Sequence, residues 1–448
     1  MRVILPRRPR FVFSPARFAS FLRRVYRQIP PRDQRLLAGL GGIAIVAMTL
    51  LFGQRLLAGD SLSRRSTFTE GLVASSLADV DPTVQSLTHS ALLSSDDHGN
   101  PTGQLAESWR ISDDAMNFEF TLRPRVDRQA VLAALNPATP SSPFASTKVE
   151  PFDDRGVRIT LTQPLAPFIA EFSKPIVPLG PYIIAERTKD HVTLMSRPDY
   201  LFGQPKLETI QLKIFPAETE LQSALEDQTV DAVANVTDGL KLPSSMTQYT
   251  LSLPRTTAAF FNLGRAGVSP LATRQQLIDR QRFEQPLSLT VVTTETLAVA
   301  GDVQQLLTDW RAANVDVKLM TLNALQLRQR IASRDYDVLI NGIDSGADPD
   351  PYPFWHSSQR KASGLNLTNF ANVDADKVLE AARSTGQADR RAKLLDQFSQ
   401  ILDAQKPWLV LNHAPLTFAV DRDLTGPLNH AGFTPTDRYA NVQAWQWK

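Results

Sequence analysis

The chain contains no cysteine among its 448 residues. Disulfide bridges, thiolate metal sites and cysteine nucleophiles are therefore excluded, as is a lipid attached through an N-terminal cysteine. The fold has to be held by packing, hydrogen bonds and ion pairs alone.

The short motifs of common enzymes are also missing. There is no phosphate-binding loop, no His-Glu-x-x-His and no Gly-x-Ser-x-Gly. Ser358 and Lys361 have the Ser-x-x-Lys spacing of penicillin-recognising enzymes, but neither Lys-Thr-Gly nor Ser-Asp-Asn occurs. We therefore expect neither an enzyme nor a bound cofactor.

Metal-ligating patterns are scarce as well. Asn372, Asp374 and Asp376 alternate as in a calcium loop, but Lys377 stands where such a loop needs glycine. We expect these residues to cap the following helix. The six histidines show no ligand spacing, and the sequence predicts no metal site: they are His89, His98, His191, His356, His413 and His430.

A large net charge is absent overall, but the average of +2 hides a division along the chain. Residues 1–35 carry +9 and residues 36–66 carry +2, which leaves −9 on residues 67–448. An acidic folded part argues against nucleic acid as a partner.

One long uncharged run is present near the N-terminus. Residues 36–53 carry no charge over 18 positions, about the length that spans a bilayer core. A buried core helix and a cleaved signal peptide are the alternatives. The basic segment before the run is long for a signal peptide, and Leu56-Leu57-Ala58 is a poor cleavage site.

We therefore expect a retained single-pass anchor over 36–57, followed by a linker over 58–66. The arginine-rich arm 1–35 would stay in the cytoplasm, and residues 67–448 would lie outside the cell membrane, extracellular or periplasmic. The arm is also suited to contact anionic lipid.

The most distinctive stretch beyond the anchor is 336–359. It begins as a short apolar run typical of a buried strand and then changes to glycine, aspartate and proline. Three acids, Asp344, Asp348 and Asp350, precede three aromatics, Tyr352, Phe354 and Trp355. A loop at the carboxyl edge of a sheet is where α/β proteins bind ligands, although such a loop can simply reverse the chain.

The surrounding patterns favour an α/β fold. Apolar strands at 287–292, 315–319 and 336–340 alternate with helices, one of which places Val303, Leu306, Leu307 and Trp310 on one face. Strand, helix, strand order predicts parallel pairing with right-handed crossovers. Earlier segments, such as 118–122 and 157–161, alternate in steps of two and predict antiparallel units.

Several ordered motifs resemble the family 5 extracellular solute-binding proteins, the peptide- and nickel-type receptors of ABC importers. The resemblance covers most of 67–448. It rests on "QLAESW" at 104–109 with "SDD" at 112–114 and "LRP" at 122–124, "GPYII" at 180–184, "RPDY" at 197–200, "GQPKL" at 203–207, "VDAV" at 230–233, "FFNL" at 260–263 and "ADPDPYPFWHSSQ" at 347–359.

The resemblance implies a two-lobed, periplasmic-binding-protein-like clamshell of the class II or cluster C type, with mixed sheets. The first lobe would span 67–255 with a reduced subdomain at about 90–170, the second lobe 256–415, and the C-terminal segment 416–448 would return to the first lobe. It further implies a monomer that binds an extended peptide between the lobes and delivers it to an ABC permease.

The same resemblance suggests which residues would meet the ligand. Backbone edges would come from the first strand around Glu70, Gly71 and Leu72, and one of the loop acids would face the peptide's ammonium group. The full candidate set is Glu70, Gly71, Leu72, Asp344, Asp348, Asp350, Tyr352, Trp355, His356 and Asn366.

Departures from the family pattern keep a second interpretation open. The family's Gly-Trp-x-x-Asp-Tyr run reads here as the six residues 342–347, without the aromatic and the acid, and segments after Pro124 and Arg280 are shortened. The alternative is a surface sensor or assembly protein that keeps the fold but transports nothing. The sequence leaves peptide, nickel complex and sugar open as ligands.

Overall fold

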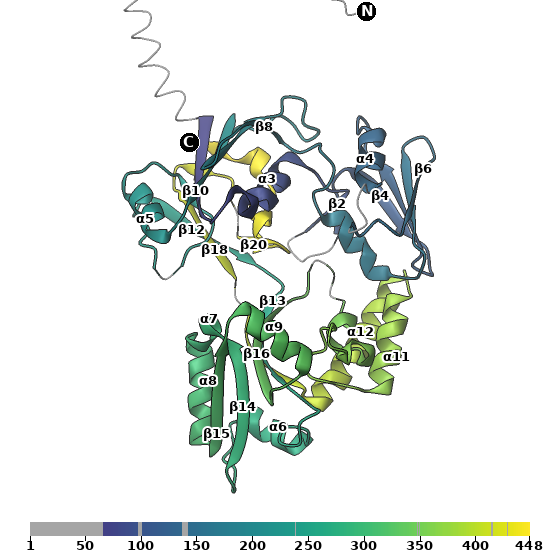
Figure 1. Ribbon diagram of the computed structural model, residues 1–448. Helices are drawn as coiled ribbons and strands as arrows, with labels where there is room; N and C mark the ends of the chain where they lie inside the picture. The colour runs from purple at the N-terminus through teal and green to yellow at the C-terminus, as the bar shows by residue number, and fades with distance from the viewer. Residues whose placement is uncertain are drawn as a thin grey trace, which may run out of the picture. The chain divides into compact units, whose positions relative to one another are not determined.

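The computed structural model of the chain describes residues 66–96, 101–136, 142–237, 239–346, 348, 350–413, 415–427 and 429–448 (Figure 1). The predicted arm 1–35, the anchor 36–57 and nearly all of the linker 58–66 lie outside these residues. Within the described ranges, no helix is both long enough and apolar enough to cross a membrane.

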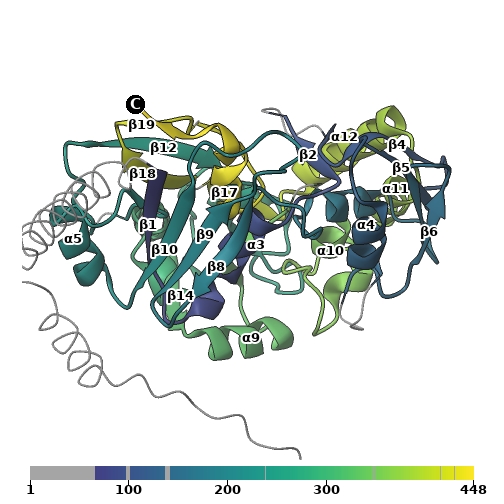
Figure 2. The same ribbon diagram turned by 90° about the horizontal axis from the view of Figure 1, so that it is seen from above.

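An eight-stranded mixed sheet contains strands from both ends of the chain (Figure 2). Strand β1 lies in its interior, parallel to β10 over its whole length and to β11 over two residues. In sheet order the strands are β20 (His430–Ala431), β12 (Met246–Ser252), β18 (Leu416–Asp421), β11 (Ala232–Val233), β1 (Thr67–Val73), β10 (Thr209–Phe215), β9 (His191–Ser196) and β8 (Tyr182–Arg187).

Short helices and the C-terminal segment cover this sheet. They are η1 (Leu77–Val80), α3 (Asp81–Thr88), α5 (Glu218–Glu226), η4 (Pro435–Tyr439) and η5 (Val442–Ala444), with a small pair of strands, β19 (Leu424–Thr425) and β21 (Gln446–Trp447). Phe68 of β1 packs edge-on against Trp445, with 5.5 Å between the ring centroids. Val442 and Trp445 are buried in the core on this sheet, and Trp447 packs against it.

A small antiparallel sheet has its own core. Its order is β4 (Ala106–Ile111), β5 (Asn117–Leu122), β7 (Gly156–Thr160) and β6 (Lys148–Phe152). Phe118, Phe120 and Leu122 alternate inward as predicted, and they pack against α4 (Arg128–Leu135) and η2 (Ala166–Ser173). A hairpin of β2 (Leu93–Ser95) and β3 (Pro101–Gly103) precedes this sheet in the sequence.

A five-stranded sheet forms the centre of the second half of the chain. Its order is β15 (Val315–Leu322), β14 (Leu287–Thr294), β16 (Val338–Asp344), β13 (Arg255–Phe261) and β17 (Trp408–Asn412). The predicted parallel pairing is confirmed, since β14 lies parallel to both β15 and β16. Strand β13 is antiparallel to β16 and β17, which makes this sheet mixed.

Helices cover both faces of the five-stranded sheet, with a separate apolar core on each face. They are α6 (Leu271–Ile278), α7 (Glu295–Ala298), α8 (Gly301–Ala312), α9 (Ala324–Ser333), α10 (Tyr352–Trp355), η3 (Ser357–Arg360), α11 (Val373–Arg383) and α12 (Ala388–Gln405). Helix α8 buries the four residues that its spacing predicted. Of the three residues expected to cap α11, Asn372 does so by accepting from the amides of Asp374 and Ala375, whereas Asp376 accepts from the Ser357 amide.

The chain passes between the two large sheets twice. The first passage joins β12 to β13, and the second joins β17 to β18. The five-stranded sheet is therefore built from one continuous segment, whereas the eight-stranded sheet is completed by β18 and β20, which follow that segment.

Candidate ligand-binding site

The acidic loop follows strand β16 at the end of the five-stranded sheet, as its sequence predicts. Asp344 is the last residue of β16 (Val338–Asp344), and Asp348 and Asp350 lie in the loop. Each of these three candidate acids is paired with an arginine. Asp344 lies 3.2 Å from Arg255 on the surface, and Asp350 accepts from Arg383 Nε at 2.9 Å. Asp348 lies 2.6 Å from Arg391 of helix α12.

The Asp348 and Arg391 pair is the most buried of these three. Only 11% of the Asp348 side chain and 17% of the Arg391 side chain are exposed, against 45% and 46% for Asp344 and Arg255. Arg391 Nη1 donates to Asp348 Oδ2 at 2.8 Å. Burial raises the pKa of Asp348 above its ordinary value, while the Arg391 guanidinium acts in the opposite direction.

This pair lines a cavity of about 430 Å³, here called the apolar cavity. One wall comes from the turn between α11 and α12 and from α12 itself; the opposite wall comes from β4 and η2. Its apolar lining residues are Pro101, Trp109, Ile111, Ala166, Ile169, Ala170, Ala388, Ala392, Leu395 and Phe433. The volume lies within the usual range of about 300–1,000 Å³ for small-molecule sites.

The two walls meet at Gly386. Its amide donates to the carbonyl of Asp113 at 3.1 Å, and a Cβ placed on Gly386 would lie 2.1 Å from the carbonyl oxygen of Ser112. Glycine is needed here because the backbone of the α11–α12 turn approaches the β4–β5 turn directly. The apolar cavity is thus closed at one side by a backbone contact between distant parts of the chain.

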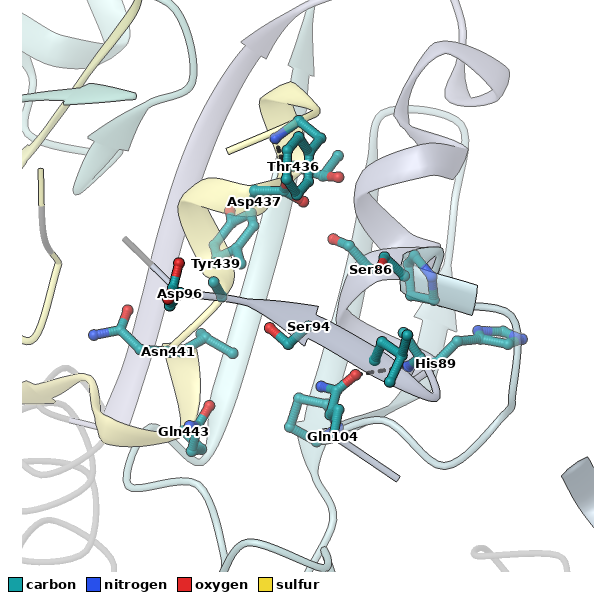
Figure 3. A pocket seen from close by; sticks show the side chains of 18 of the residues that line it. Ser86, His89, Ser94, Asp96, Gln104, Thr436, Asp437, Tyr439, Asn441 and Gln443 are labelled. Carbon is teal, nitrogen blue, oxygen red and sulfur yellow. Dashed lines mark hydrogen bonds between the residues drawn. The ribbon is translucent and has the colours of Figure 1, made fainter. Parts of the chain in front are cut away.

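A second cavity, of about 260 Å³, lies beside α3, the β2 strand and the C-terminal segment (Figure 3). We call it the polar cavity, because Ser86, His89, Asp96, Gln104 and Asn441 are among its lining residues. Burial lowers the pKa of His89, which favours the neutral imidazole at neutral pH. Ser94, Ser173 and Phe433 line both cavities, which are therefore adjacent.

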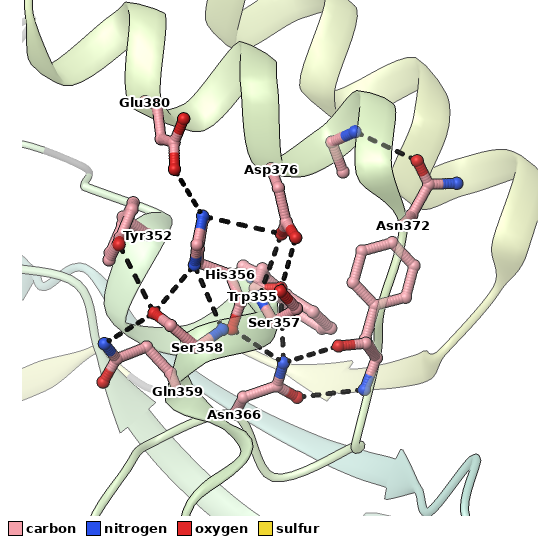
Figure 4. A network of polar contacts seen from close by, with 12 residues as sticks. Tyr352, Trp355, His356, Ser357, Ser358, Gln359, Asn366, Asn372, Asp376 and Glu380 are labelled. Carbon is pink, nitrogen blue, oxygen red and sulfur yellow. Dashed lines mark hydrogen bonds and ion pairs between the residues drawn. The ribbon is translucent and has the colours of Figure 1, made fainter.

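The aromatic end of the loop has a structural role (Figure 4). His356 accepts from the Ser358 amide at Nδ1, lies 3.3 Å from Glu380 at Nε2, and stacks on Tyr352 at 4.0 Å. Because the Ser358 amide donates to Nδ1, the neutral imidazole carries its proton on Nε2. His356, a candidate ligand contact, thus takes part in hydrogen bonds that hold the loop. The same network holds the Ser358 hydroxyl, 2.8 Å from His356 Nδ1.

Trp355 and Asn366 are likewise buried and in contact with the protein itself. Trp355 is 4% exposed and packs against Phe370 and Trp408. Asn366 donates to the carbonyls of Trp355, His356 and Phe370. Both side chains are thus held by the core and by the loop, and their contact with a ligand stays a prediction.

The first strand, which was expected to offer a backbone edge to the ligand, lies in the interior of its sheet. Glu70 and Gly71 are paired on both sides, with β10 and β11, so they offer no free backbone edge. The Glu70 carboxylate accepts from Arg438 and Tyr439, and Leu72 packs on the sheet's core. The sequence pattern showed a strand but could not show that it lies in the interior of the sheet.

Sequence reasoning found Asp348 but missed its partner and the walls of its cavity. Arg391 lies 43 residues away on α12, and Trp109, Ile169 and Phe433 come from three other segments. Nothing in one sequence pairs such distant residues. Among the described residues, no three His, Asp or Glu side chains are grouped as a metal site would need.

No protein-family model matches the chain. Among curated proteins, it is 22% identical to heme-binding protein A of Haemophilus influenzae, over 73% of this chain and 82% of that protein. It is 21% identical to the probable D,D-dipeptide-binding periplasmic protein DdpA of Escherichia coli, over 72% and 81%. A 131-residue segment is 27% identical to the oligopeptide-binding protein AppA of Bacillus subtilis and spans 29% of this chain and 23% of AppA.

Solved structures share the architecture. A nickel ABC transporter protein from Bacillus halodurans superposes with a TM-score of 0.70 at 17% identity, over 83% of this chain and 98% of that one. AppA of Bacillus subtilis, in complex with a nonapeptide, gives a TM-score of 0.59 at 17% identity, over 85% and 99%. The fold is therefore the mixed α/β, periplasmic-binding-protein-like fold. These relatives and neighbours are named as binding proteins for oligopeptide, D,D-dipeptide and heme and as a nickel ABC transporter.

Proposed function

We propose that the chain is the substrate-binding protein of an ABC importer, which binds an extended peptide between two lobes and delivers it to a membrane permease. The observation that carries the proposal is the apolar cavity, whose opposite walls come from the small antiparallel sheet with η2 and from the α11–α12 helices. A site whose walls come from two separate parts of the fold can close around a ligand when those parts move toward each other.

The names of the relatives support a peptide as the ligand. AppA is named for oligopeptides and DdpA for D,D-dipeptides, while heme-binding protein A is named for heme. The polar cavity adjoins the apolar cavity through Ser94, Ser173 and Phe433, and together they offer room for side chains of different character. Of the predicted site residues, Asp348 is the one that we keep in the proposed site.

We further propose the lobe boundaries 67–255, 256–415 and 416–448, and a membrane anchor at 36–57 that holds the binding part outside the cytoplasm as a monomer. The support for the anchor is the uncharged 18-residue run with its arginine-rich flank. DdpA is described as periplasmic, which agrees with that side of the membrane.

Native mass spectrometry of the purified full chain in detergent, combined with a thermal-shift screen against a peptide mixture, tests the proposal. We expect a co-purified or added peptide of a few residues to raise the unfolding temperature. Ligand-free protein without any shift would exclude peptide binding and favour the sensor or assembly protein. A shift with a nickel complex or heme instead would retain the transport class and change its substrate.

A further inference from the structure

The apolar cavity carries no net charge in its lining. Asp348 and Arg391 are the two charged residues among those that line it, and their side chains lie 2.6 Å apart. Arg391 Nη1 donates to Asp348 Oδ2 at 2.8 Å and Nη2 lies 2.6 Å from Oδ1, so the negative charge is matched by a positive charge of the same chain.

Neighbouring charges are matched in the same way. Asp350, two residues further along the loop, is held by Arg383, whose guanidinium lies 3.9 Å from the centre of the Tyr352 ring. Neither Asp350 nor Arg383 lines the apolar cavity. The loop therefore brings two acids and two arginines to this region, and each carboxylate has a guanidinium beside it.

The rest of the lining favours an apolar group. Trp109, Ile111, Ile169, Leu395 and Phe433 provide large apolar surfaces, and four alanines leave the space between them open. Burying an ammonium group against such walls without its own counter-ion costs several kcal/mol. An acyl group or an apolar side chain would lose no such hydration, and it would gain from burial of its own surface.

We propose that the apolar cavity selects an uncharged, apolar end of the ligand, such as an acylated peptide N-terminus or an apolar side chain, and that Arg391 sets this preference by neutralising Asp348. The proposal rests on the proposed peptide-binding function and makes it more specific. It contradicts the expectation that Asp348 binds a free ammonium group.

The first test uses the unmodified full chain and two matched tetrapeptide sets with apolar first residues, one with free and one with acetylated N-termini. We expect the acetylated set to bind at least about tenfold more tightly by isothermal titration calorimetry. Equal binding, or tighter binding of the free amines, would overturn the inference while leaving the peptide-binding function intact. If neither set bound, both proposals would fall together.

The second test changes the charge of the lining. Arg391→Gln leaves the Asp348 carboxylate without its counter-ion, and we expect the free-amine set to gain at least about tenfold relative to the acetylated set. The double variant Asp348→Asn, Arg391→Gln restores a neutral lining and should restore the preference for acetylated peptides.

Arg383→Gln is the matched control, because it removes a neighbouring ion pair that does not line the cavity. It should leave the preference unchanged. A reversal in this control as strong as in Arg391→Gln would show that the general charge of the loop, and not Arg391, sets the preference. The unmodified chain still decides the inference if Arg391→Gln does not fold.

Discussion

Two buried carboxylate–arginine pairs lie in different surroundings, although both have an arginine Nη2 2.6 Å from a carboxylate oxygen. Glu70 and Arg438 are each 2% exposed and join strand β1 to the C-terminal segment. Tyr439 donates a further hydrogen bond of 2.6 Å to Glu70. Asp348 and Arg391, by contrast, lie at the wall of a cavity.

The difference shows how the setting of an ion pair decides its role. The Glu70 pair is enclosed on all sides, and burial followed by the charge of Glu70 raises the pKa of Tyr439 well above its ordinary value. The tyrosine hydroxyl therefore stays protonated and continues to donate. Such a pair fixes structure, whereas a pair that borders a cavity also contributes its charges to the cavity wall.

The largest expected effect tests the structural pair. Glu70→Gln would leave Arg438 buried without a counter-ion and should lower the free energy of unfolding by about 3–5 kcal/mol. Chemical denaturation of the full chain measures this. The double variant Glu70→Met, Arg438→Met should recover much of the loss, and a single variant as stable as the unmodified chain would contradict the structural role.

A smaller effect tests whether the apolar cavity depends on the close approach of its two walls at Gly386. Gly386→Ala places a methyl group against the Ser112 carbonyl, so the turns must separate at a cost of roughly 1–3 kcal/mol. We expect weaker binding of the tetrapeptides and faster hydrogen exchange in the β4–β5 turn. Gly301→Ala is the control, because nothing lies within 4 Å of its added Cβ. Unchanged exchange in the β4–β5 turn of Gly386→Ala would rule out the wall contact.

The smallest effect concerns pH. The pKa of Asp348 is raised by burial, so the folded chain holds this proton more tightly than the unfolded chain does. The contribution of Asp348 to stability should therefore fall as pH rises from about 4, the ordinary value of aspartate, through its raised pKa. The stability difference between the unmodified chain and Asp348→Asn, measured by denaturation at several pH values, should show this decline. A difference that grows over the same range would give the pKa shift the opposite sign.

Local patterns predicted the elements well because their causes are local. The spacing of Val303, Leu306, Leu307 and Trp310 alone places one face of α8 in a core, and the parallel order of β14, β15 and β16 follows from the alternation of strand and helix. The candidate site was harder to predict. Asp348 could be named from its loop, but the arginine that neutralises it comes from a helix 43 residues later.

The first strand shows the same limit. Its sequence is that of a strand whether it lies at an edge or in the interior, and the interior position depends on β10 and β11, far along the chain. The structure pairs Glu70 with Arg438, a partner that the strand pattern does not indicate. An acid in a strand gives no signal of its counter-ion when that residue is 368 positions away.

That separation has a consequence for the order of folding. At a synthesis rate of about 5–20 residues per second, Glu70 emerges roughly 20–70 s before Arg438 exists. During that interval the core around Phe68 lacks Trp445, and the eight-stranded sheet lacks β18 and β20. The strands of the five-stranded sheet, β13 to β17, are all made before β18 and β20. This sheet can therefore form before the eight-stranded sheet is complete. The first strand to be made is thus among the last to be enclosed, and the late C-terminal segment is the step at which the polar cavity acquires its final wall.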